Sequence, residues 1–211
     1  MSETPERVLQ RVYNLQGVDE AEEVYDEWAG NYDADTVDGL GYLGPGLAAA
    51  RLADVAPGVG VVLDAGCGTG LAGVALNERL SVTIDGADIS EGMLERARGR
   101  GVYRNLVKTD LTRPLEFADD SYDAVLCVGT LTDGHVGPAA FDEFVRVVRA
   151  GGVVVATVLA RVWESGGYKA HLDGMAERGV VTVREADEHP IFDGPDGATC
   201  RLCVVEVNST A

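Results

Sequence analysis

The sequence predicts an α/β fold built on a mostly parallel β-sheet. Its 211 residues suit one domain with a full core. From residue 59 onward, strand-like runs alternate with helix-like segments, as they do in βαβ units. The turn-rich connection between the last two runs favours a hairpin, so we expect an antiparallel edge strand. The seven predicted strands are residues 59–63, 82–87, 105–109, 122–128, 153–159, 180–185 and 199–207.

The first 58 residues show no strand signal and predict helices. Residues with one shared helical face are Ala21, Val24, Tyr25, Trp28 and Tyr32. We expect residues 1–58 to form a helical cap within the same domain as a ligand-binding core, residues 59–211. Such a cap would close over the carboxyl ends of the strands, where open α/β sheets bind their ligands. Val24 and Trp28 are expected in core packing.

Residues 61–70 read VVLDAGCGTG, an apolar run that ends in Asp64 and is followed by glycine at every second position. The run predicts a buried strand. The glycines allow a sharp turn and close contact with a ligand before a helix that starts near Leu71. A dinucleotide fingerprint would place its third glycine where this chain has Leu71. The Asp64 carboxylate suits a cationic ligand end, such as an ammonium group, and would repel a diphosphate.

A later helix is predicted by Phe141, Phe144, Val145 and Val148, which recur at helical spacing. Pro138 suits its first turn, and the pair Gly151-Gly152 is expected to end it. We expect this helix to pack on the sheet.

Two further acids follow predicted strands. Asp88 ends the second strand, where a carboxylate can accept hydrogen bonds from both hydroxyls of a ribose. It could instead cap the helix that begins near Glu91, although Ser90 is the better cap. Asp110, before Leu111, follows the third strand and could also be a simple turn residue. Asp64, Asp88 and Asp110 each stand at or just after the end of a predicted strand, and together they favour a bound nucleoside.

These motifs together resemble those of class I S-adenosylmethionine (SAM) dependent methyltransferases: Asp64-x-Gly66-x-Gly68-x-Gly70, Asp88, Asp110-Leu111, the run 122–129 and the run 146–152, in which Ala150 replaces the commoner proline. A second set of motifs resembles the Williams–Beuren syndrome critical-region methyltransferase-like group: Tyr25-Asp26-x-Trp28-Ala29-x-x-Tyr32-Asp33-x-Asp35, Tyr42-x-x-Pro45 and Tyr168-Lys169. The resemblance implies a Rossmann-like class I methyltransferase fold with a seven-stranded, mostly parallel sheet, an antiparallel edge strand and the N-terminal helical cap. It also implies SAM as the cofactor.

The resemblance assigns a part of the cofactor to each motif. The loop from Gly66 through Cys67, Gly68 and Gly70 would approach the methionine part, with Cys67 as a small turn residue and no nucleophile. Asp88, followed by Ile89, would hold the ribose. Asp110 and Leu111 would hold the adenine. The end of the fourth strand, Cys127, Val128, Gly129 and Thr130, would line the methionine end and the methyl group.

Methyl transfer is an in-line displacement, so positioning does most of the work, and only an alcohol or phenol acceptor needs a base. His135 and Tyr32 are the candidate catalytic residues, and Asp133 is a further polar candidate. Tyr25, Tyr32 and Tyr168 are the candidate substrate contacts. No metal-ligand cluster is evident, so we expect no metal.

The net charge of −18, from 35 acids against 17 bases, argues against a nucleic-acid partner, because phosphate backbones are bound by basic patches. The longest apolar stretch, residues 153–160, is too short to cross a bilayer, and the polar N-terminus gives no sign of secretion. We therefore expect a cytoplasmic protein with a small-molecule substrate and no membrane partner. Cys200 and Cys203 lie three apart in a predicted strand and face opposite sides, so a structural role is expected.

Three functions remain open from the sequence. The first is a methyltransferase acting on an O, N or S atom of a small molecule. The second is a nicotinamide-dependent oxidoreductase, against which Leu71, Asp64 and Asp110 speak. The third is a protein that binds SAM without turnover. Oligomeric state is not encoded in any motif.

Overall fold

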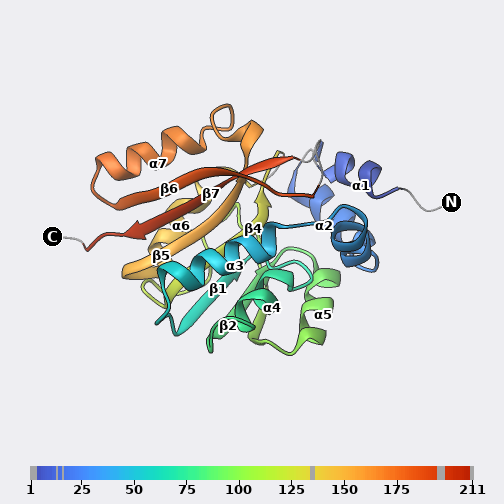
Figure 1. Cartoon of the computed structure of the whole chain (residues 1–211), viewed down its shortest axis with the longest axis horizontal. Coiled ribbons are helices and arrows are strands. Elements are labelled where there is room, and N and C mark those ends of the chain that lie inside the picture. Colours follow the sequence, from blue (N-terminus) through green and yellow to red (C-terminus); the bar gives the residue numbers. More distant parts are fainter. Residues whose placement is uncertain (1–3, 13, 16, 134–135, 194–197, 210–211) are drawn as a thin grey trace.

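The computed structural model describes residues 4–12, 14–15, 17–133, 136–193 and 198–209. They form one seven-stranded sheet in the order β3-β2-β1-β4-β5-β7-β6, with helices on both faces (Figure 1). Only β7 runs against its neighbours, pairing antiparallel with β5 and β6. The strands are β1 Val61–Ala65, β2 Thr83–Asp88, β3 Tyr103–Lys108, β4 Tyr122–Leu131, β5 Val148–Leu159, β6 Val181–Pro190 and β7 Thr199–Val207. The predicted seven-stranded, mostly parallel sheet is confirmed.

The predicted antiparallel edge is also confirmed, with one detail that the sequence did not contain. The antiparallel strand, β7, lies one place in from the edge, and β6 forms the edge itself. β6 continues to Pro190, five residues beyond the predicted end, through the run ADEHP, which is exposed or half-buried. An edge strand tolerates such residues because one of its sides faces solvent.

Helices flank the sheet in two layers. Their bounds are α1 Pro5–Val12, α2 Val18–Trp28, a π-helical turn Ala34–Gly39, α3 Gly44–Val55, α4 Leu71–Asn77, α5 Glu91–Arg100, α6 Ala140–Val147, a short 3-10 turn Ala160–Val162 and α7 Tyr168–Glu177. On one face Leu52 of α3 and Leu76 of α4 pack against β-strand residues such as Leu126. On the other face α6 and α7 cover a second cluster. Alternate residues of each strand supply the two clusters.

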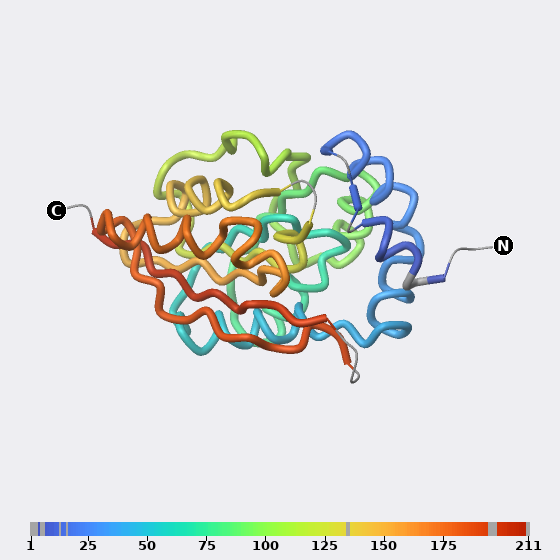
Figure 2. Tube along the Cα trace, turned by 90° about the horizontal axis from the view of Figure 1, so that it is seen from above, coloured from blue at the N-terminus to red at the C-terminus, as the bar shows by residue number. Residues whose placement is uncertain are grey.

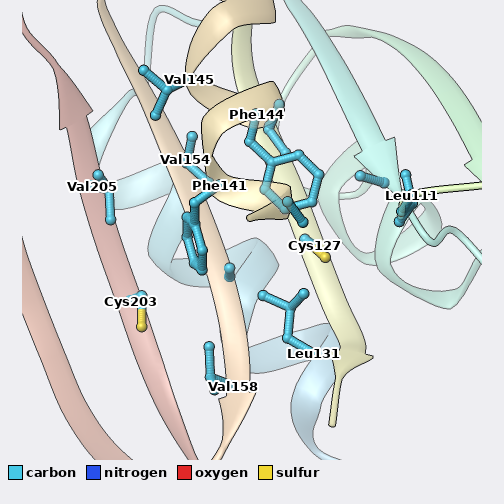
Figure 3. Close-up of a cluster of buried hydrophobic side chains, with 14 of the residues drawn as sticks. Leu111, Cys127, Leu131, Phe141, Phe144, Val145, Val154, Val158, Cys203 and Val205 are labelled. Atoms are coloured by element: carbon cyan, nitrogen blue, oxygen red, sulfur yellow. The ribbon is translucent and has the colours of Figure 1, made fainter. Parts of the chain in front are cut away.

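Figure 3 shows the α6 side of this core. Phe141 and Phe144 project from α6 toward β4 and β5, with ring centroids 5.9 Å apart. The helix ends at Val147, however, and Gly151-Gly152 does not end it. Both glycines lie in β5, and a Cβ on Gly152 would stand 2.4 Å from the Asp123 carbonyl oxygen. Gly152 therefore serves the close approach of β5 to β4.

The two cysteines of the C-x-x-C motif are buried in β7 and have no disulfide. Cys203 belongs to the α6 side of the core, whereas Leu202 and Val204 belong to the α3 side. This alternation places Cys200 on the face opposite Cys203, as predicted.

The N-terminal segment divides into two parts. α3, the last helix of the expected cap of residues 1–58, belongs to the helix layer beside α4. The remaining elements, α1, α2 and the π-helical turn, form what we call the N-terminal cap. Figure 2 shows it gathered at the end of the molecule away from the C-terminus. Val24 and Trp28 are buried inside it, as predicted. In the described ranges, every helix is too short or too polar to cross a membrane.

Candidate active site

A pocket lies where β1, β2, β3 and β4 end, beneath the N-terminal cap. It holds about 580 Å³ of empty space, including the part that is open to solvent. Its described lining residues are Tyr25, Tyr32, Gly66, Gly68, Asp88, Ile89, Met93, Thr109, Asp110, Leu111, Val128, Gly129, Thr130 and Val136. Loops from four strands thus converge on one pocket. It lies at the carboxyl ends of the strands, where the sequence predicted a ligand site. We call it the cofactor pocket.

The glycine loop, residues 66–70, forms one wall. Gly66, Gly68 and Gly70 have φ values of 74°, 52° and 91°, which L side chains rarely adopt. The amides of Gly66 and Cys67 donate to the Ala87 carbonyl at 2.7 and 3.0 Å and fix the loop to β2. A Cβ on Gly66 would stand 2.1 Å from the Thr130 hydroxyl, whereas a Cβ on Gly68 would meet no atom within 4 Å. Gly68 therefore leaves free space in the pocket that a ligand can occupy.

Asp88 lies at the end of β2 and is only 9% exposed. Its Oδ2 accepts a hydrogen bond from the Gly68 amide at 2.8 Å, and its Oδ1 accepts one from the Ser90 amide at 2.9 Å. Burial raises the pKa of the carboxyl, and these backbone donors oppose the rise. Each oxygen keeps a further acceptor position, so the carboxylate can receive ribose hydroxyls while it holds the glycine loop.

Ser90, and not Asp88, caps α5. Its hydroxyl accepts from the Met93 amide at 3.0 Å, which confirms the preference drawn from sequence. Met93 itself lines the pocket and was missed, although its place in the first turn after Asp88 was a usable signal.

Asp110 combines the two roles that the sequence left open. Its Oδ1 accepts from the Thr112 amide at 2.8 Å, which makes a local turn, and its side chain also lines the pocket. Leu111 is buried beside it. Thr109 lines the same wall and was missed, because nothing in the strand pattern set it apart from its neighbours.

The end of β4 forms another wall of the pocket, away from the wall of Asp110 and Leu111, where adenine is expected. Val128, Gly129 and Thr130 line it, and Gly129 has φ of 74° with its amide donating to the Thr157 hydroxyl at 2.9 Å. Cys127 points to the opposite face, into the α6 core (Figure 3). Burial there raises the pKa of its thiol. Because side chains alternate along a strand, the Cys127 side chain does not line the pocket.

Asp64 is also turned away from the pocket. Its side chain is fully buried beneath the glycine loop, where Oδ2 accepts from the Tyr103 hydroxyl at 2.7 Å. Burial raises the pKa of this carboxyl to about 7. The expectation that it receives a ligand ammonium is not supported by this geometry, because Asp64 does not line the pocket.

Cys67 and Gly70 belong to the same underside of the loop. The Cys67 side chain packs with Leu94 and Ala97 of α5, and burial raises the pKa of its thiol. Gly70 precedes α4 and faces Tyr103. Neither lines the cofactor pocket, so both shape the loop without contacting the ligand site.

Comparison with known proteins identifies this part of the chain. Residues 62–152 match the sequence profile of a family described as "Methyltransferase domain". This segment, which is less than half of the chain, is similar to methyltransferase domains. It contains the glycine loop, Asp88, Asp110 and the end of β4.

Relatives extend the match beyond that segment. Human methyltransferase-like protein 27 is 40% identical over 137 residues, which cover 63% of this chain and 55% of the human protein. A demethylmenaquinone methyltransferase from Clavibacter sepedonicus is 40% identical over 105 residues, 48% of this chain and 42% of that protein. The chain thus spans about half the length of these relatives.

The fold is shared with solved structures. A protein of Methanococcus maripaludis described as an S-adenosyl-L-methionine-dependent methyltransferase superposes with a TM-score of 0.60 at 15% identity, covering 91% of this chain and 94% of that chain. The Rossmann-like methyltransferase fold is therefore confirmed.

Two acids, Asp26 and Asp33, join the N-terminal cap to the glycine loop and to α5. Asp26 on α2 accepts hydrogen bonds from the Ser90 hydroxyl and from the Gly92 amide, the latter at 2.9 Å. Asp33 accepts from the Thr69 hydroxyl in the glycine loop and pairs with Arg100. These contacts explain the spacing of the N-terminal motif, since the tyrosine before each acid, Tyr25 or Tyr32, lines the cofactor pocket.

The remaining candidates are Tyr168, Asp133 and His135. Tyr168 is buried beside α6, and its hydroxyl donates to the Val136 carbonyl at 2.6 Å. Its side chain does not line the cofactor pocket, and its contact with substrate stays a prediction. Asp133 pairs with Arg161 at 2.5 Å. His135 lies outside the described residues.

Proposed function

We propose that this protein is a SAM-dependent methyltransferase that transfers a methyl group to an O, N or S atom of a small-molecule acceptor. One observation carries the proposal. Gly68 leaves open space in a pocket that also presents the Asp88 and Asp110 carboxylates from the ends of neighbouring strands. The residues present fit SAM, since they offer a close backbone approach, an acceptor for ribose hydroxyls and an acceptor for the adenine amino group.

When bound, SAM supplies an electrophilic methyl group for an in-line displacement. The glycine loop would hold the methionine end near Gly66 and Gly129, and Asp88 would orient the ribose. Tyr25 and Tyr32 lie over the pocket from the cap and would exclude water from the reacting atoms. Positioning of this kind accounts for most of the rate enhancement in such a transfer.

The acids that line the pocket, Asp88 and Asp110, both belong to its nucleoside end. Among its described lining residues, Tyr32 offers a hydroxyl that can orient an acceptor by a hydrogen bond, which keeps Tyr32 as the catalytic candidate. Tyr32→Phe should lower kcat for an alcohol or phenol acceptor and leave kcat for a thiol acceptor nearly unchanged.

The test of the function begins with ligand binding. SAM and S-adenosylhomocysteine (SAH) should each raise the melting temperature at millimolar concentration, and NAD⁺ should not. Formation of SAH from labelled SAM in the presence of acceptor pools would establish turnover. Stabilisation by NAD⁺ alone would favour the oxidoreductase, and binding of SAM without SAH formation for any acceptor would favour a non-catalytic protein. We further propose a cytoplasmic location. We also propose that nucleic acid is not a substrate, because the net charge of −18 would repel a phosphate backbone.

A further inference from the structure

A second cavity adjoins the cofactor pocket beneath the N-terminal cap. It lies between the cap, the ends of β4 and β5 and the segment that follows β6, and it holds about 440 Å³ of empty space, including the part open to solvent. Three residues line both cavities: Tyr25, Tyr32 and Gly129. The two spaces therefore meet at the end of β4, beside the wall assigned to the methionine end. A molecule in the second cavity would therefore lie next to the wall that would hold the methionine end of SAM.

The walls of this cavity are aromatic and aliphatic. From the cap come Trp28 and Tyr32, whose ring centroids are 4.7 Å apart. From the opposite wall come Tyr42 and Phe192, whose ring centroids are 5.3 Å apart. Tyr42 and Phe192 also form an isolated antiparallel bridge, which joins the segment before α3 to the segment after β6. The Trp28–Tyr32 pair is edge-to-face and the Tyr42–Phe192 pair is tilted, so aromatic surface is available from both pairs to a flat, apolar molecule.

None of the described residues that line this cavity is charged, in a chain with 35 acids and 17 bases. Two of its polar groups are also already engaged. The Trp28 indole donates to Asp35 at 2.8 Å, and the Thr36 hydroxyl donates to the Tyr32 carbonyl at 2.7 Å. An ion placed here would lose its hydration without gaining an oppositely charged partner.

We propose that this cavity is the acceptor site and that it selects an uncharged, aromatic or alicyclic acceptor. The inference rests on the proposed function, because it takes the neighbouring pocket as the SAM site. Selection follows from desolvation. Burying a neutral ring is favourable in proportion to its apolar area, whereas burying an unpaired carboxylate or ammonium is strongly unfavourable. Carboxylated and phosphorylated acceptors are thereby disfavoured.

The test compares three probes of nearly equal size and different charge: naphthol, naphthoate and naphthylmethylammonium. Calorimetry on the full chain saturated with SAH would give a Kd for each. Naphthol should bind at least about tenfold more tightly than either ion, since each tenfold step in Kd is only ~1.4 kcal/mol. Equal or tighter binding of an ion would overturn the proposal, as would the absence of naphthol binding to protein that binds SAH normally. Failure of SAH itself to bind would instead remove the proposed function.

A pair of variants locates the effect in this cavity. Phe192 is half-buried, so Phe192→Arg can place a guanidinium in the cavity while its chain packs on the rings. This variant should reverse the preference from naphthol to naphthoate and keep the affinity for SAH. Val180→Arg adds the same charge at an exposed position at the opposite end of β6 and should keep the wild-type order. An unchanged order in Phe192→Arg, or a reversal in Val180→Arg, would contradict the assignment.

Discussion

Asp33 in the N-terminal cap accepts a hydrogen bond from the hydroxyl of Thr69, which lies within the glycine loop. Arg100 at the end of α5 joins the same carboxylate and also donates to the Thr69 carbonyl at 3.1 Å. The cap therefore touches the proposed SAM site twice. Its tyrosines lie over the pocket, and its acid holds the loop that forms the pocket wall.

The first prediction concerns this contact. Asp33→Ala should weaken SAM binding by about three- to tenfold, or ~0.7–1.4 kcal/mol, because the glycine loop loses its anchor to the cap. Calorimetry would measure the change. Asp38→Ala removes an exposed acid from the same π-helical turn and serves as the control for charge. Normal SAM affinity in Asp33→Ala would show that the contact stabilises the cap alone.

The second prediction concerns Gly68. It distinguishes loss of the space that a ligand would occupy from strain in the backbone. Gly68→Ala and Gly101→Ala both place a side chain at positive φ, 52° and 69°, and neither new Cβ would meet an atom within 4 Å. Both should therefore lose ~1–2 kcal/mol of folding stability. Only Gly68→Ala should lower SAM affinity, by at least about tenfold, because Gly68 lines the pocket. Thermal unfolding and calorimetry test the two parts, and similar SAM affinities in the two variants would mean that the loop has been misassigned.

The third prediction concerns Asp88. From its place at a strand end, the sequence alone would suggest a solvent-facing acid with little structural role. Because it is buried and accepts two backbone donors, Asp88→Ala should lose about 1–3 kcal/mol of stability as well as SAM affinity. Asp85→Ala is the matched control. Asp85 is a buried acid of the same strand that accepts from Arg104 and Asn105 outside the pocket. It should lose comparable stability and keep normal SAM affinity. Equal loss of affinity in both variants would trace the effect to folding.

The fourth prediction follows from Asp64. Its pKa in the folded protein, about 7, lies above the ordinary value of 3.8. Between these values the folded state holds a proton that the unfolded state has released, so this group lowers stability as pH rises, by up to about 1.4 kcal/mol per unit. Asp64→Asn does not titrate, so its stability relative to wild type should rise over that window and level off above about pH 7.

Urea unfolding of both proteins at a series of pH values would measure this difference. Acids with lowered pKa values, Asp85, Asp123 and Glu143, contribute equally to both proteins and cancel. Tyr103→Phe removes the hydrogen bond that lowers the pKa of Asp64 and should extend the window to higher pH. A difference that does not change with pH would show that Asp64 is ionised throughout.

The sequence by itself determined the features that depend on neighbouring residues: the strands, the turn after β1 and the cap of α5. Periodicity located all seven strands, the glycine spacing located the turn after β1, and Ser90 was recognised as the cap of α5. Asp88 and Asp110 reached the expected pocket because the ends of adjacent parallel strands meet at one edge of a sheet. These are consequences of short-range backbone geometry, which neighbouring residues fix.

Only the tertiary structure decided which way the remaining candidates face. Asp64 and Asp88 both follow apolar runs, yet Asp64 is held under the loop by Tyr103, which lies 39 residues away. Tyr42 and Phe192 are far apart in the sequence and meet in one wall of the second cavity. The Tyr168 hydroxyl donates to the Val136 carbonyl. Such environments arise from contacts between distant segments, and a pattern of neighbouring residues contains no information about a partner that folding brings to it.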